Sequence, residues 1–234
     1  MSTSATDLGG AWPGALEDIS THWTQIQDPV QFVLRYSRAI QAYLLALLKQ
    51  PHDADDVSQE FVIHFLQRGL AAADPDRGRF RDYLKVAVRR AALAHLREQG
   101  REPQSASGLE HVADSQVESE ADSRYRDEWR SCLLDRAWRG IERHVREHPA
   151  CGFDVALTIA REHPHLNSDE RALEASRLLG RPINSSAYRQ MLRRARGLLK
   201  VLLIQEVSKT LRNPTPAAIE EELADLELLA LLRK

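Results

Sequence analysis

The sequence is poor in cysteine, in aromatic residues and in long apolar runs. Only Cys132 and Cys151 occur among its 234 residues, too few for a disulfide framework. Aromatic residues make up 6% of the chain, whereas the helix-favouring Ala, Leu, Arg and Glu dominate. The apolar stretches, such as 43–48, fall far short of the roughly 20 residues that cross a bilayer. We therefore expect an all-α protein and no membrane partner.

Signals for secretion and for common catalytic sites are also missing. The opening residues, MSTSATDLGG, lack the basic start and apolar stretch of a secretory signal, so we expect a cytoplasmic protein with reduced cysteines. No phosphate-binding glycine loop, nucleophile elbow or convincing carboxylate pair occurs, and we expect no enzyme. His144, His148 and Cys151 have a spacing that a metal site could use, but no fourth ligand is evident. We expect neither a metal nor a cofactor.

Charged residues, by contrast, are plentiful and unevenly distributed. They form 28% of the chain with a formal net charge of -2, which as a bulk figure argues against a nucleic-acid partner. Basic residues nevertheless crowd into 77–101 and 189–212, while acidic residues crowd into 102–128 and the stretch after Ala217. The chain therefore has two positive segments separated by a negative connector.

Helical periodicity predicts two small helical domains joined by an acidic linker. Apolar residues recur at helical spacing over 29–49, 53–69 and 80–97, and again over 125–141, 153–161, 169–179 and 186–211. Between them, the stretch 102–122 has the Ser, Glu and Asp content of a linker. We expect five parts: a loose lead-in (1–27), a first helical domain (28–101), the acidic linker (102–124), a second helical domain (125–212) and an acidic, leucine-rich C-terminal helix (213–234).

The second domain contains the pattern of a helix-turn-helix. The helix expected over 169–179 closes at Gly180, and a short turn leads to a basic helix that opens with Ser185 and Ser186. Arginines on neighbouring turns of that helix could contact phosphates and base edges in a major groove. The pattern favours DNA binding, and a solvated helix face is the alternative.

Three segments resemble a known family. DADDVSQEFVIHFL (53–66) resembles the segment by which sigma factors bind the clamp helices of RNA polymerase. GRFRDYLKVAVRRAALAHLRE (78–98) is similar to the helix that melts and recognises the minus-ten element, and 172–203 resembles the region that recognises the minus-thirty-five element. The chain thus resembles the sigma-70 family, extracytoplasmic-function type, and the run 206–210 with the acidic tail resembles a planctomycete-like subset.

The resemblance implies roles for three groups of residues. Polymerase binding is implied for Asp53, Asp55, Asp56, Gln59 and Glu60. Contact with minus-ten DNA is implied for Arg77, Arg79, Phe80, Arg81, Tyr83, Lys85, Arg89 and Arg90. Contact with minus-thirty-five DNA is implied for Ser185, Ser186, Tyr188, Arg189, Arg193 and Arg194. Melting a duplex requires cations for the phosphates and a pocket for an unstacked base, which the loop 74–80 would supply.

The expected function is promoter-specific transcription initiation, with core RNA polymerase and promoter DNA as partners and no catalytic residue. An anti-sigma factor or another protein regulator is an open class of partner. One alternative is a sigma-like helical adaptor that binds only protein, and another is a helix-turn-helix DNA-binding regulator that does not initiate transcription. Phe80 and Tyr83 are equally compatible with a role as core aromatics, which their burial would decide.

Overall fold

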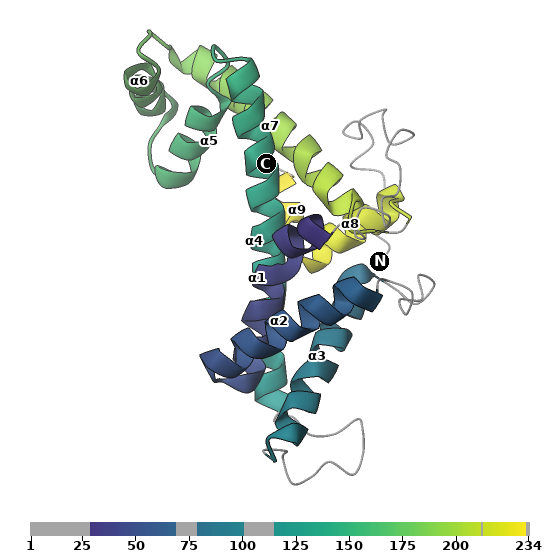
Figure 1. Ribbon diagram of the computed structural model, residues 1–234. Coiled ribbons are helices and arrows are strands. Elements are labelled where there is room, and N and C mark those ends of the chain that lie inside the picture. Colours follow the sequence, from purple (N-terminus) through teal and green to yellow (C-terminus); the bar gives the residue numbers. More distant parts are fainter. Residues whose placement is uncertain (1–28, 69–78, 101–114, 212, 233–234) are drawn as a thin grey trace, which may run out of the picture. The chain divides into compact units, whose positions relative to one another are not determined.

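The computed structural model describes residues 29–68, 79–100, 115–211 and 213–232, and all regular structure in these ranges is helical (Figure 1). The prediction of an all-α fold is confirmed. The elements are α1 (Pro29–Leu48), α2 (Pro51–Arg68), α3 (Phe80–Glu98), α4 (Ser115–Glu147), α5 (Phe153–Glu162), α6 (Ser168–Leu179), α7 (Ser185–Ser208), α8 (Pro216–Asp225) and α9 (Leu229–Leu232). None of the helices in the described ranges is long and apolar enough to cross a bilayer.

Contacts divide the chain into two compact units. Of the described residues, the first unit comprises those in 29–132 and 207–232, and thus α1, α2, α3, the start of α4, and α8 with α9. The second unit comprises 133–206, and thus the rest of α4, then α5, α6 and most of α7. The C-terminal segment, which its composition sets apart in the sequence, belongs by its contacts to the first unit.

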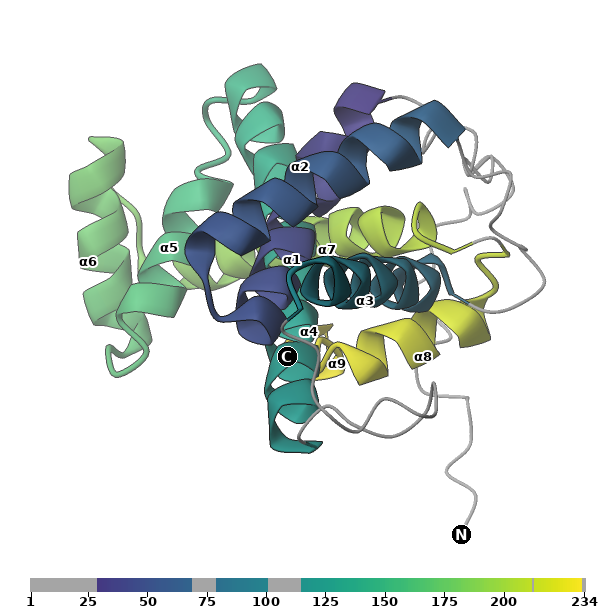
Figure 2. The same cartoon turned by 60° about the horizontal axis from the view of Figure 1, so that its bottom comes forward.

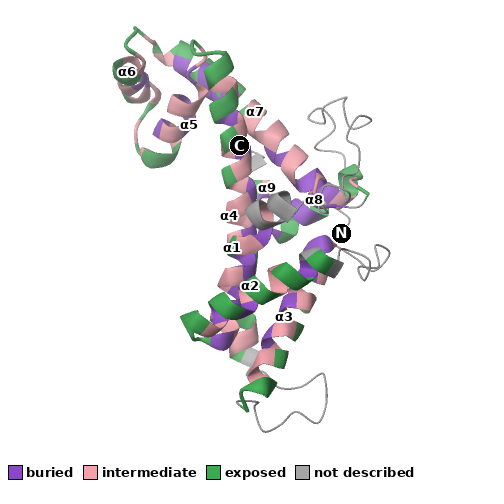
Figure 3. Ribbon diagram, viewed as in Figure 1, coloured by how far each residue is buried: buried purple, intermediate pink, exposed green. Residues whose placement is uncertain are grey.

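An aromatic cluster forms the centre of the first unit. The ring of Tyr36 stacks on Trp129 at a centroid distance of 4.9 Å and lies 5.1 Å from the ring of Phe80. Tyr43 meets Tyr125 edge to face at 5.4 Å. Since these pairs join α1, α3 and α4, the part of α4 around Tyr125 and Trp129 is integral to the core. Figure 3 marks the buried positions along the helices.

The start of α4 lies within the segment expected to be a linker. Of that segment, 102–114 lies outside the described residues, as does the lead-in 1–27, whereas 115–124 is helical. Over residues 115–129 of α4, the buried positions are only Ala121, Tyr125 and Trp129, spaced four residues apart among polar neighbours. Because only one residue per turn is buried, the helical periodicity is weak, and the average composition of the segment is that of a linker.

Small residues and caps shape the second unit. Its core includes Ile141, Ile159, Tyr188 and Met191. The helix expected from residue 169 begins one residue earlier, because Asn167 caps it: its side chain accepts from the backbone N–H of Asp169 and Glu170, and Glu170 accepts in return from the Asn167 N–H. This is a capping box, and Gly180 closes the helix in the left-handed conformation as predicted.

The C-terminal segment forms two short helices, α8 and α9, where the sequence predicts one helix within 213–234. At the end of α8, Glu227 has a φ of 57°, and its N–H donates to the carbonyl of Ala224 at 2.9 Å. The N–H of Leu228 donates to the carbonyl of Leu223 at 2.8 Å, and both leucines are buried. This pair of bonds with its apolar contact is a Schellman motif. The residue in the left-handed conformation is Glu227 and not the usual glycine, so the sequence carries no signal for the end of α8.

A test of the packing uses Gly152, which precedes α5 with a φ of 61°. A Cβ at this position would lie 2.8 Å from Leu179. Gly152→Ala should therefore lower the free energy of unfolding by about 1–2 kcal/mol or more, since the left-handed conformation alone costs that much. Urea denaturation followed by circular dichroism measures it. Gly197→Ala is the control, because Gly197 lies in α7 with open space around it and should gain slightly; equal stability of both variants would contradict the assignment.

Candidate nucleic-acid interface

The basic residues of α3 lie beside a buried stripe that fixes the helix in the core. Phe80, Leu84, Val88 and Ala92 are buried at intervals of four residues. The intervening positions place Arg81, Lys85 and Arg89 along a neighbouring side of the helix, also at intervals of four. Arg79, an extended residue just before the first turn, adds a fourth cation at the start of this line.

The two arginines at the start of α3 contact the acidic helix α8. Arg79 forms ion pairs with Glu222 at 3.0 Å, with Glu221 at 2.5 Å and with Asp225. Arg81 lies 3.5 Å from Glu222 and 3.7 Å from Asp225. Glu222 is only 1% exposed, and Figures 1 and 2 show α8 near the start of α3.

The ionisation of these groups follows from their surroundings. Burial raises the pKa of the Glu222 carboxyl, and the charges of Arg81 and Arg79 act in the opposite direction without cancelling it. Burial lowers the pKa of the Arg79 guanidinium, but its hydrogen bond to Asp225 and the nearby carboxylates raise it above its ordinary value overall. Arg79 is therefore held as a cation by α8.

The next two cations of α3 contact the acidic start of α4. The ammonium of Lys85 donates to Asp122 at 2.9 Å, and Arg89 pairs with Glu118. Both cations are half-buried. Thus every one of the four cations on this line faces a carboxylate of another helix of the first unit.

The remaining residues implied for minus-ten DNA have different surroundings. Phe80 is fully buried in the aromatic cluster, so its ring packs as a core residue and is not exposed for base stacking. Tyr83 is half-buried, and Arg90 is exposed. Arg77, together with most of the loop 74–80, lies outside the described residues.

The residues implied for polymerase binding follow α2 from the side that faces α1 to the side that faces α3. Asp55 and Gln59 line a pocket with Gln41 of α1 and Glu128 of α4, and Gln41 donates to Asp55 at 2.5 Å. Asp56 is exposed and pairs with His52 one turn earlier at 3.0 Å. Asp55, Asp56 and Gln59 form one accessible surface.

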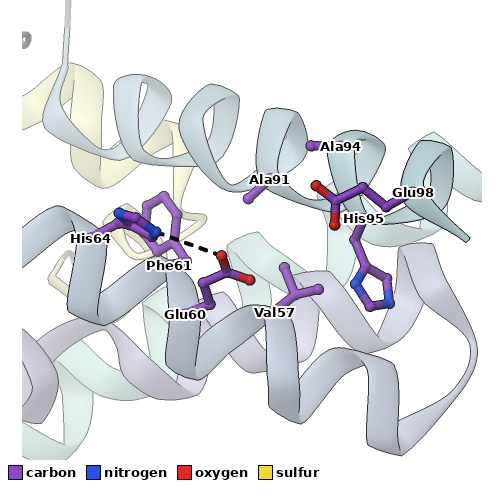
Figure 4. A pocket seen from close by; sticks show the side chains of 8 residues that line it. All are labelled: Val57, Glu60, Phe61, His64, Ala91, Ala94, His95 and Glu98. Atoms are coloured by element: carbon purple, nitrogen blue, oxygen red, sulfur yellow. Dashed lines mark ion pairs between the residues drawn. The ribbon is translucent and has the colours of Figure 1, made fainter.

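The other two acidic residues lie toward α3. Glu60 lines a groove of about 150 Å³ between α2 and α3 and lies 3.5 Å from His64 (Figure 4). Asp53 is half-buried, with His95 of α3 at 3.6 Å. The structure therefore places Asp55 and Gln59 beside α1 and Asp53 and Glu60 beside α3, with Asp56 exposed one turn before Glu60.

The residues implied for minus-thirty-five DNA divide into core and surface positions on α7. Tyr188 is buried, and its hydroxyl donates to the carbonyl of Ala156 at 3.1 Å, so it holds α5 against α7. Ser185 is half-buried at the first position of the helix, and Ser186 is exposed. The helix is capped by a residue that was not among those predicted: the side chain of Asn184 accepts from the Ala187 N–H at 2.8 Å.

Three arginines of α7 form its accessible basic surface. Arg189 and Arg193 are exposed and one turn apart, and Arg194 is exposed beside them. Arg194 also lines a groove of about 320 Å³ with Arg181. The sequence did not predict that Arg181 lies beside Arg194, because a basic residue in a turn is not part of a helical pattern.

The histidines weighed as metal ligands lie at the end of α4. The rings of His144 and His148 stack at 4.4 Å, and His144 also stacks on Phe153 at 5.4 Å. Among the residues that the structure describes, no three or more His, Cys, Asp or Glu side chains gather as a metal site would require.

Comparison with known families bears on the first unit. Residues 32–102 match the family model described as sigma-70 region 2. This range spans all of α2 and α3 and nearly all of α1, so this part of the chain is similar to sigma-70 region 2. Searches of curated proteins and of solved structures gave no match.

The surroundings of Tyr43 predict that the stability of the fold falls at alkaline pH. Burial, first, and then the charge of Asp122 raise the pKa of Tyr43 from 10.0 to about 12. Because the folded-state pKa is the higher one, the contribution of Tyr43 to stability is complete below pH 10 and is lost as the pH rises toward 12. Tyr43→Phe should remove this loss, on the order of 2 kcal/mol. Urea denaturation of both proteins across this window measures it; parallel stability curves would contradict the assignment.

Proposed function

We propose that this chain is a sigma factor that binds core RNA polymerase and directs initiation at promoters with minus-ten and minus-thirty-five elements. The observation that carries the proposal is the match of 32–102 to sigma-70 region 2. In this proposal the accessible acidic and amide surface of α2 binds polymerase, α3 contacts the melted minus-ten DNA, and α6 with α7 acts as a helix-turn-helix on the minus-thirty-five element. No catalytic residue is needed.

The finer parts of the proposal have their own support. Arg189, Arg193 and Arg194 are exposed on α7, where they can contact phosphates and base edges of a DNA major groove. The connection 180–184 that precedes α7 is fixed by the Ser176 hydroxyl, which accepts from the Ile183 N–H at 2.8 Å. The extracytoplasmic-function type, the planctomycete-like subset and a cytoplasmic location rest on the sequence resemblance. An anti-sigma factor or other regulator would act on the same surfaces.

The first test is binding to polymerase. Asp56→Ala with Gln59→Ala should abolish co-purification of the full chain with core RNA polymerase, because both side chains are exposed on the α2 surface. Glu142→Ala with Glu147→Ala, two exposed carboxylates of α4, is the matched control and should bind as the unaltered chain does. Retention of binding by the α2 variant would contradict the α2 assignment. Absence of binding by the unaltered chain would instead favour the adaptor or the regulator.

The second test concerns DNA binding by α7. Arg189→Glu with Arg193→Glu should weaken promoter binding by the polymerase complex and lower the slope of log affinity against log salt by about 1 for each phosphate that α7 no longer binds. Arg143→Glu with Arg146→Glu, exposed on α4, carries the same change in charge. Filter binding over a salt series measures both variants, and an equal slope for the two would refute a phosphate-binding role for α7.

A further inference from the structure

The line of cations on α3 is covered by the chain's own carboxylates. From the start of the helix onward, Arg79 and Arg81 face α8, and Lys85 and Arg89 face α4. The two acidic helices come from distant parts of the sequence: Arg79 and Glu222 are 143 residues apart. The acidic blocks thus lie on the basic block that is proposed to contact DNA.

Apolar contacts keep α8 in place independently of its outer charges. Ile219, Leu223, Leu226 and Leu228 are fully or almost fully buried, and Thr215 caps the helix by accepting from the Ala218 N–H at 3.2 Å. Glu222 is buried with them and points at both arginines. Leaving one partner of a buried ion pair without the other strongly destabilises a protein, so loss of the Glu222 contact is strongly disfavoured.

The outer carboxylates of α8 are held differently. The side chains of Glu221 and Asp225 are 68% and 47% exposed, although both pair with Arg79, which is 20% exposed. Exposed ion pairs contribute little to stability and are readily exchanged. A phosphate group that replaced either carboxylate at the outer side of the Arg79 guanidinium would leave the buried residues of α8 in place.

The pairs with α4 repeat this arrangement further along α3. The side chains of Lys85 and Asp122 are 31% and 40% exposed, and those of Arg89 and Glu118 are 39% and 34% exposed. Water reaches all four, so their pairing is open to competition by phosphates and weakens with salt. The carboxylates of α8 and α4 thus form a row of anions along α3, as the phosphates of a nucleic-acid strand would.

We propose that Glu221 and Asp225 of α8, continued by Asp122 and Glu118 of α4, form an autoinhibitory acidic screen that competes with DNA phosphates for the cations of α3. The inference rests on the proposed function, since it takes α3 as the DNA-contacting helix. DNA binds by exchanging its phosphates for these carboxylates, while Glu222 and the buried leucines keep α8 docked.

The screen is tested by neutralising its outer part in the full chain. Glu221→Gln with Asp225→Asn should raise the affinity for a fluorescent single-stranded DNA oligonucleotide about threefold to tenfold, since two exposed pairs no longer compete. It should also steepen the salt dependence, because Arg79 becomes available to phosphate. Fluorescence anisotropy at several salt concentrations measures both quantities.

The matched control is Glu220→Gln with Glu227→Gln. It makes the same change in net charge in the same segment, but Glu227 pairs with Arg130 of α4 and not with α3. Its affinity should stay within twofold of the unaltered chain. Equal affinity of the screen variant and the unaltered chain, or an equal rise in the control, would overturn the proposal.

A stability check and the choice of assay keep the outcomes separate. Both variants alter accessible carboxylates and leave Glu222 in place, so equal melting temperatures should show that α8 remains docked. The assay contains no polymerase, so the screen is judged on DNA affinity alone. A chain that fails to bind polymerase but shows the affinity rise would defeat the proposed function and keep the screen; polymerase binding without the rise would do the reverse.

Discussion

The burial of Phe80 at the start of α3 is the constraint on which the first unit depends. Its ring contacts Tyr36 of α1, which stacks in turn on Trp129 of α4, so one aromatic cluster joins three helices. Because Phe80 is fixed inward, Arg79 and Arg81 on either side of it are directed toward α8. The hydroxyl of Tyr125 reinforces this turn by donating to the Arg81 carbonyl at 3.0 Å. Core packing thus positions the charged groups of the candidate interface.

The acidic helices α4 and α8 form ion pairs with the basic helix α3. A net charge of -2 is unusual for a protein proposed to bind DNA, but the acidic blocks of α4 and α8 lie on the basic block of α3. Arg189, Arg193 and Arg194 of α7, by contrast, are exposed. The two proposed DNA contacts therefore differ: the cations of α7 are accessible, and most of those of α3 must exchange a carboxylate for a phosphate.

Local signals explain how much the sequence predicted. The predicted spans 29–49 and 80–97 agree with α1 and α3 within one residue, because buried side chains recur along these helices at helical spacing. The start of α4 was missed because its stripe of Ala121, Tyr125 and Trp129 lies among charged residues. The break after α8 was missed because Glu227 takes the left-handed conformation usually left to glycine. The pairing of Arg79 with Glu222 could not be predicted, since no local pattern relates residues so far apart.

Reconstituted transcription tests most directly the proposal that this chain is a sigma factor. Core RNA polymerase would be incubated with the purified chain and a library of promoter fragments from the source genome, and the 5′ ends of the transcripts would be sequenced. A sigma factor should produce initiation at a limited set of positions that share minus-ten and minus-thirty-five motifs and that require the chain. Transcripts that are the same with and without the chain, despite its binding to polymerase, would contradict the claim.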